Sequence, residues 1–213
     1  MINFDNVLYT PLNIPMLPLA NRDRIIELYK EHATNITKPS DPNLPVFWKG
    51  LTCYKGPTFT DEMLMHVGTY IDMSELLKDD VEILNTYLPL EVESISLWTN
   101  IQHVPSHHDK LMYDTRLDFR FRFVITQDKK SFFIDYGDKK RHITLPESTN
   151  TFCFNNQPCS HGASFDPDNF KILGVIRGKI TDEQKLADLL ESSIQKYSDT
   201  CYTTENFFGQ PQG

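Results

Sequence analysis

Residues 103–109 of this 213-residue sequence, His-Val-Pro-Ser-His-His-Asp, hold its densest set of metal-binding side chains. In an extended segment residues two apart point to the same side, so the imidazole of His107 and the carboxylate of Asp109 converge on one ion. A chain with seven histidines produces such a pair by chance, and a histidine at the end of a strand is commonly just solvated. The pair alone therefore predicts little, and a third ligand decides its meaning.

A third ligand follows a second predicted strand. Residues 151–155, Thr-Phe-Cys-Phe-Asn, have strand character and lead through residues 156–160 to His161. Two histidines and one carboxylate make a facial triad, which leaves three positions of an iron ion open. We therefore predict that His107, Asp109 and His161 are the metal ligands and the catalytic residues.

Two other histidines flank the HxD pair and are alternative ligands. His103 is followed by Val-Pro, which favours a structural role, and His108 should point away from its two neighbours on an extended segment. We keep both as second choices to the triad.

An arginine in an apolar strand is the next chemical signal. Arg177 closes the apolar run of residues 171–176, Lys-Ile-Leu-Gly-Val-Ile. A guanidinium in such a strand needs a partner, and its planar fork matches a carboxylate held by two hydrogen bonds. The alternative is an edge-strand arginine that reaches solvent. Beside the triad we favour an anchor for the carboxylate of a cosubstrate.

The elements that must position these residues divide the chain into a helical front and a strand-rich middle. After an extended leader over residues 1–20, helices are predicted from Asn21, near Thr60, and from Asp72, which has Glu75 at capping-box spacing. Apolar residues then alternate with period two, which indicates strands at residues 94–101, 116–126, 131–136, 142–145, 149–154 and 171–180. A closing helix is predicted from Thr181, with Gln184 at capping distance.

These elements predict one α+β domain over residues 1–198 with a mostly β core of jelly-roll or barrel type. Its parts are a helical N-terminal region over residues 20–88, the jelly-roll core over about residues 91–180 and the closing helix over residues 181–198. The polar residues 199–213 are expected to form a flexible tail.

The order of HxD, strand-rich middle, Phe-Asn-Asn before His-Gly, and arginine on the following strand resembles the 2-oxoglutarate and iron(II)-dependent oxygenases. It is similar in particular to their prolyl hydroxylase-like and aspartyl/asparaginyl β-hydroxylase-like branches, over about residues 91–180. The resemblance implies a cupin-like double-stranded β-helix with iron bound by the triad and Arg177 paired with the distal carboxylate of 2-oxoglutarate. It also implies O2 as a cosubstrate, release of succinate and CO2, and hydroxylation as the default outcome.

One departure from the family pattern adds a second anchor candidate. The interval between His161 and Arg177 is longer than in many relatives because residues 164–170 are inserted. Arg116 stands where aspartyl/asparaginyl hydroxylase-like members place an arginine that helps hold 2-oxoglutarate, so it is the reserve candidate.

Residues 116–125 form a ladder in which arginines and phenylalanines alternate. One face carries Leu117, Phe119, Phe121, Phe123 and Ile125, and the other carries Arg116, Asp118, Arg120, Arg122 and Val124. Ordinarily the phenylalanines would turn inward and the arginines to water. If helices cover the outer side of this sheet, the phenylalanines pack under them and the arginines line the barrel. Our hypothesis is that Arg120 or Arg122 helps bind 2-oxoglutarate or an anionic group of the substrate, with Asp118 holding the set in register.

Composition narrows the partners. The net charge of −8 repels a phosphate backbone, so no nucleic acid partner is expected. The four cysteines show no CxxC spacing, and no signal peptide or membrane span is evident, so we expect a cytoplasmic protein. The expected substrate is a protein side chain, a peptide or a small amino-acid-like molecule.

Two other interpretations stay open at this point. One is a cupin-type binding module without redox turnover, and the other is a metal-dependent enzyme of the same scaffold that does not use 2-oxoglutarate. Arg177 discriminates between them and the oxygenase, because only a cosubstrate-dependent enzyme needs a carboxylate anchor.

Overall fold

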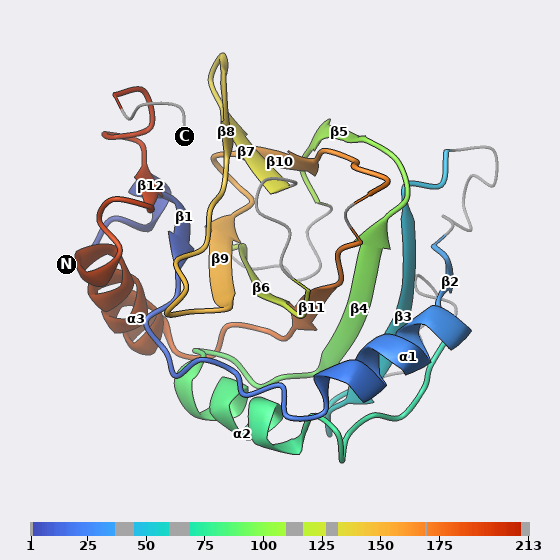
Figure 1. Cartoon of the computed structure of the whole chain (residues 1–213). Coiled ribbons are helices and arrows are strands. Elements are labelled where there is room, and N and C mark those ends of the chain that lie inside the picture. The colour runs from blue at the N-terminus through green and yellow to red at the C-terminus, as the bar shows by residue number, and fades with distance from the viewer. Residues whose placement is uncertain are drawn as a thin grey trace.

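The computed structural model describes residues 2–36, 45–59, 69–109, 117–126, 132–168 and 170–209. Within these ranges its helices lie along the outside of a large curved sheet (Figure 1). They are the 3-10 helix η1 (Phe4–Asn6) and the α-helices α1 (Arg22–His32), α2 (Lys78–Tyr87) and α3 (Glu183–Lys196). No helix among these residues has the length and apolarity needed to cross a membrane.

The large sheet is antiparallel, in the order β12-β1-β9-β6-β11-β4-β3-β2. Its strands are β1 (Val7–Pro11), β2 (Thr34–Asn35), β3 (Trp48–Lys55), β4 (Ser94–Asn100), β6 (Phe119–Val124), β9 (Thr151–Asn155), β11 (Leu173–Arg177) and β12 (Tyr202–Thr203).

A smaller antiparallel sheet lies across from the large one (Figure 1). Its strands, in the order β5-β10-β7-β8, are β5 (Val104–His107), β10 (Ser160–Ala163), β7 (Phe132–Tyr136) and β8 (Lys139–His142). Gly137 has a positive φ of 63° in the tight turn between β7 and β8, where the sequence predicts a turn.

From β4 to β11 the chain passes repeatedly from one sheet to the other. β4, β6, β9 and β11 belong to the large sheet, whereas β5, the β7–β8 hairpin and β10 come between them and belong to the small sheet. Strands that are distant in sequence therefore become neighbours, and the mostly β core expected from the sequence is found.

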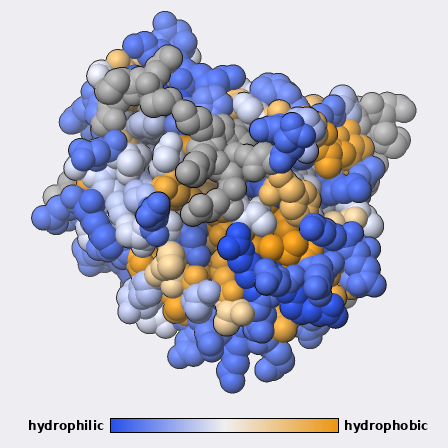
Figure 2. All heavy atoms as spheres, in the orientation of Figure 1, coloured by the Kyte–Doolittle hydropathy of each residue, from blue (hydrophilic) through white to orange (hydrophobic). Residues whose placement is uncertain are grey.

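The two faces of the large sheet carry two separate cores. The outer core joins the five apolar ladder residues, Phe121 and Phe123 among them, to apolar side chains of α1, α2 and α3. The inner core joins Phe132 and Ile134 of the small sheet to Phe152 and Phe154 of the large one. On the face drawn in Figure 2, orange hydrophobic residues gather toward the middle and blue hydrophilic residues surround most of them.

In the arginine and phenylalanine ladder of β6, the phenylalanines pack under the helices and the arginines turn inward, because helices cover the outer face. Phe119, Phe121 and Phe123 lie in the outer core, so Arg120 and Arg122 point from β6 toward the small sheet. Both arginines are buried, with 9% and 7% of their surface exposed. Arg116 lies outside the described residues.

The front half of the chain is less helical than predicted, because β3 belongs to the large sheet, whereas β1 falls within the leader that is expected to be extended. The helix expected from Asp72 begins only at Lys78, since the Asp72 carboxylate accepts hydrogen bonds from the amide and hydroxyl of Ser74 and closes a turn instead. The helix predicted near Thr60 lies outside the described residues.

Other elements differ from prediction at their ends. α1 begins after Asn21 as expected, but the Asn21 amide donates to the Leu76 carbonyl oxygen and makes no cap hydrogen bond to its own helix. α3 is capped by the side chain of Asp182, one residue after the predicted cap. No strand is found over most of residues 142–145, because β8 spans Lys139–His142 and shares only His142 with the predicted strand.

Part of the expected flexible tail is folded against the sheet. Tyr202–Thr203 form β12, which pairs with β1, and Phe207 is fully buried in the inner core. The Arg141 guanidinium donates from Nε to the Phe207 carbonyl oxygen at 3.0 Å. Strand pairing and the burial of Phe207 together hold this part of the tail against the sheet.

Candidate metal centre

The register of β5 and β10 places two of the predicted ligands opposite one another. His107, the last residue of β5, is the cross-strand partner of His161, and their ring centroids are 4.5 Å apart. Asp109 follows two residues later, with its two carboxylate oxygens 3.6 Å from His107 Nε2 and 3.7 Å from His161 Nε2. One potential ligand atom from each residue lies within 4.8 Å of the other two. The structure therefore brings all three predicted residues together.

Hydrogen bonds help set the state of the rings. His107 Nδ1 lies 2.9 Å from the Pro105 carbonyl oxygen, which only accepts, so Nδ1 carries the proton and a neutral ring keeps its lone pair on Nε2. His161 is 5% exposed and lies against the rings of Phe132 and Phe154. These contacts fix both rings with Nε2 toward Asp109.

The electrostatics favour a neutral imidazole beside an ionised carboxylate. Burial lowers the pKa of His161 to about 3, and the charges of Arg122 and Arg120 act in the same direction, against the pull of Asp109. Burial by itself raises the pKa of Asp109, but its close contact with His107 and the nearby His161 and arginines bring that pKa well below its usual range. Both residues are thus in the forms that bind a metal ion.

A cationic wall on β6 stands beside the triad. Arg122 Nη2 lies 3.6 Å from an Asp109 carboxylate oxygen, and its Nη1 donates to the Phe121 carbonyl oxygen at 2.9 Å. Arg120 lies with Nε 2.8 Å and Nη2 3.1 Å from the two carboxylate oxygens of Asp118. Asp118 thus holds Arg120 in place, as the ladder predicts, and both guanidinium groups occupy the space between the sheets.

Arg177 extends this wall to the next strand. It shares a face of β11 with Leu173, which belongs to the inner core, and the register places it across from Ser94 of β4. Its positive charge is close enough to help lower the pKa of Arg122, which burial brings to about 10. Ser94 is 1% exposed, and its hydroxyl has no hydrogen-bond partner among the described residues.

Asn156 is a site residue that the sequence does not single out, although it belongs to the Phe-Asn-Asn run. Its side chain bonds to the main chain of Asp109 and to the Asp118 carboxylate, and it is 3% exposed. Two asparagines after a strand are a turn signal. Nothing in the sequence indicates that one of them reaches a residue 47 positions earlier.

The other histidines of the HxD segment lie outside the triad. His108 Nδ1 donates to the Asn156 carbonyl oxygen at 2.8 Å, and the ring of His103 stacks on Phe133. Neither joins the group of potential ligands found among the described residues.

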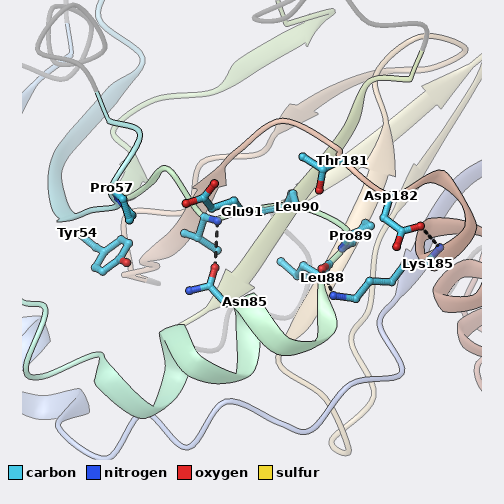
Figure 3. Close-up of a pocket in the computed structure, with 11 residues that line it drawn as sticks. Tyr54, Pro57, Asn85, Leu88, Pro89, Leu90, Glu91, Thr181, Asp182 and Lys185 are labelled. Carbon is cyan, nitrogen blue, oxygen red and sulfur yellow. Dashed lines mark hydrogen bonds between the residues drawn. The ribbon is translucent and has the colours of Figure 1, made fainter.

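A surface cavity of about 440 Å³ lies elsewhere, at the junction of α2, α3 and the end of β3 (Figure 3). None of the triad residues or of the three wall arginines lines it. Two of its polar side chains bind the main chain. Asn85 Oδ1 accepts from Val92 N–H, and Lys185 Nζ donates to the Leu88 carbonyl oxygen. We assign this cavity no role in the chemistry.

No protein-family model matches the sequence, and no curated protein matches it. Solved structures similar in shape include the following three. AviO1 from Streptomyces viridochromogenes Tue57 is 11% identical, with a TM-score of 0.47, and the match covers 84% of this chain and 93% of that one.

The other two are prolyl hydroxylases. A prolyl-4-hydroxylase from Pseudomonas putida is 13% identical with a TM-score of 0.42, covering 81% of this chain and 94% of its own. A prolyl hydroxylase from Trichoplax adhaerens, in complex with a hypoxia inducible factor peptide fragment, is 10% identical with a TM-score of 0.49, covering 84% and 86%. At this identity the function must be argued from the side chains of this chain.

Proposed function

We propose that this protein is a non-haem iron(II) and 2-oxoglutarate-dependent dioxygenase that hydroxylates a protein side chain or a small amino-acid-like substrate. The convergence of His107, Asp109 and His161 beside a buried cationic wall carries the proposal. We take the alternation of strands between the two sheets as a double-stranded β-helix, a scaffold that brings ligands from different strands to one point.

The donor set fits a transition metal. Two neutral imidazole nitrogens and one carboxylate make a facial set that suits iron(II) and leaves other positions for small ligands. The low pKa of both His161 and Asp109 keeps these groups deprotonated at neutral pH, so no proton must be displaced from them. When bound, iron(II) with 2-oxoglutarate and O2 would supply the oxidation of a substrate C–H bond, with release of succinate and CO2.

The cationic wall supports a dicarboxylate cosubstrate. Arg122 stands within 3.6 Å of Asp109 and so can reach only groups close to the metal. Two methylene groups separate the distal carboxylate of 2-oxoglutarate from its keto group, so the anchor for that carboxylate must stand further from the metal. We assign this role to Arg177, one strand away on β11, and the buried Ser94 hydroxyl across from it could donate to the same carboxylate.

The remaining residues of the site have supporting roles. Phe132 and Phe154 pack against His161 and keep water from that side of the ring. Arg120 and Arg122 supply positive charge that a bound anion would offset, and Asp118 keeps Arg120 in the wall. Arg116 keeps its place as the reserve anchor proposed from the sequence.

The proposal is tested by adding iron(II) and then 2-oxoglutarate to the purified protein without oxygen. Bidentate chelation of iron by 2-oxoglutarate should produce a weak metal-to-ligand band in the visible spectrum. Absence of the band, with iron bound, would favour a metal enzyme that does not use 2-oxoglutarate. Absence of metal binding altogether would favour the cupin-type binding module.

A further inference from the structure

Asn156 makes an unusually complete set of hydrogen bonds for one side chain. Its Oδ1 accepts from the Asp109 main-chain N–H at 2.8 Å, and its Nδ2 donates to the Asp109 carbonyl oxygen at 3.0 Å. The same Nδ2 donates to Asp118 Oδ2 at 2.6 Å. The main-chain N–H of Asn156 also donates to the Asp118 carbonyl oxygen at 2.9 Å.

These bonds fix the orientation of the amide. An exchange of its oxygen and nitrogen would place the oxygen against a carbonyl and a carboxylate, which only accept, and the nitrogen against an N–H donor. The observed arrangement is therefore the one in which every contact is a hydrogen bond.

Asp109 lies where the sheet no longer holds the chain. β5 ends at His107, and the pairing of β5 with β10 extends no further toward Asp109. Beyond that point the Asn156 side chain replaces the neighbouring strand as hydrogen-bond partner, because it binds both the N–H and the carbonyl oxygen of the Asp109 main chain. The direction of the Asp109 carboxylate depends on this support.

We propose that Asn156 is the positioning residue of the metal centre: it holds Asp109 in the ligand geometry and ties it to the Asp118–Arg120 pair of the cationic wall. The inference rests on the proposed function, since it concerns the same triad. It adds a support for the carboxylate ligand that lies outside the three ligands themselves, and such partners commonly contribute about 10–100-fold to metal affinity.

The chain offers a matched control in the preceding residue. Asn155 is also an asparagine, also buried, at 2% exposed, and its side chain makes two comparable hydrogen bonds. Its Nδ2 donates to the Phe4 carbonyl oxygen and its Oδ1 accepts from Gln157 N–H, so neither bond reaches the triad. A loss of stability common to both positions can therefore be separated from an effect on the metal.

The experiment is a titration of the full chain with Mn(II) alone, followed by electron paramagnetic resonance, with thermal unfolding of each variant in parallel. Asn156→Ala should weaken Mn(II) binding at least about 10-fold. Asn155→Ala should stay within about twofold of the wild type while losing a similar amount of thermal stability. Equal Mn(II) affinity in the two variants would overturn the inference.

A second variant covers the case in which Asn156→Ala does not fold. Asn156→Asp keeps the size of the side chain and the acceptor for Asp109 N–H, but it loses the donor and puts a carboxylate against Asp118. Its added negative charge would by itself attract a cation more strongly. Weaker Mn(II) binding therefore supports a positioning role, and equal or tighter binding contradicts it. If the wild type binds no Mn(II), the proposed function fails and not this inference alone.

Discussion

His107 and His161 face one another across two adjacent antiparallel strands, with their ring centroids 4.5 Å apart. The two residues reach this position because β5 and β10 are neighbours in the small sheet although the chain crosses to the large sheet between them. Asp109 completes the group from the segment that follows β5, so the three candidate ligands come from two stretches of chain.

Replacement of Asp109 by alanine should abolish Mn(II) binding, with a loss of affinity of at least about 100-fold, because the carboxylate is the anionic ligand. Asp109 is partly exposed, so the variant should keep its fold, as checked by circular dichroism. His103→Ala is the control, since that ring stacks on Phe133 outside the triad. Comparable binding in wild type and Asp109→Ala would refute the assignment of Asp109.

Replacement of Arg177 by alanine should raise the dissociation constant of 2-oxoglutarate by at least about 10-fold, because a charge-assisted pair of hydrogen bonds is lost. Binding of iron(II) should change little. Arg177→Lys keeps the charge without the planar fork, so its dissociation constant for 2-oxoglutarate should lie between those of the wild type and Arg177→Ala. The measurement is the anaerobic titration of the visible band, which needs no knowledge of the substrate.

Arg122→Ala should act differently from Arg177→Ala. Arg122 lies next to an Asp109 oxygen, so its removal should change both metal affinity and the apparent Michaelis constant for the cosubstrate or the substrate. Unchanged kinetics in a normally folded variant would show that Arg122 has no part in binding. Arg141→Ala, which removes a buried arginine that contacts Phe207, is a control for general destabilisation.

The metal-free protein should lose stability as the pH falls from 7 to 5. Burial lowers the pKa of His161 to about 3, whereas in the unfolded chain it is near 6.5. Below about pH 6.5 the unfolded state therefore binds more protons than the folded state. This lowers the free energy of unfolding by roughly 1–2 kcal/mol at pH 5. Asp109, whose pKa is also lowered, acts in the same direction only below about pH 4.

This pH effect is measured by urea unfolding at the two pH values in wild type and His161→Asn. The variant lacks the buried imidazole, so the difference between pH 7 and pH 5 should shrink by the same roughly 1–2 kcal/mol. An undiminished difference would assign the effect to other groups.

Gly162→Ala should weaken the site through the backbone. A Cβ at this position would lie 2.6 Å from the Val104 carbonyl oxygen on β5 and against the ring of Phe133 on β7. β10 would have to move away from its neighbours, which would separate His161 from His107. We expect a lower melting temperature and weaker Mn(II) binding, with Gly209→Ala as a control because its surroundings are open.

Much of the metal centre follows from local patterns in the sequence. The HxD pair at the end of an alternating strand and the His-Gly pair after a second strand predict the ligands that the structure brings together. The alternation of residues 117–125 similarly predicts two faces, and the presence of helices decides which face is inside. Period-two patterns of this kind are legible because every second residue shares one environment.

The rest could not be read because it depends on distant partners. Asn156 supports Asp109 from 47 residues away, and the sequence around either residue does not indicate this contact. α2 begins at Lys78 and not near Asp72, because the Asp72 carboxylate, which resembles a helix cap, accepts its hydrogen bonds from Ser74. Part of the tail lies against the fold through distant contacts, because β12 pairs with β1 and Phe207 is buried in the inner core.

The alternation of strands between the two sheets also governs when the centre can exist during folding. The pairing of β5 with β10 joins strands that are separated in sequence by β6, β7, β8 and β9, so we expect it to form late in folding. In an early, partly collapsed species the three side chains would then not yet lie close together. Metal added to a refolding mixture should consequently leave the early phases unaltered and stabilise the finished state by mass action alone. A bound metal ion would then mark protein that has finished folding, and it would not nucleate folding.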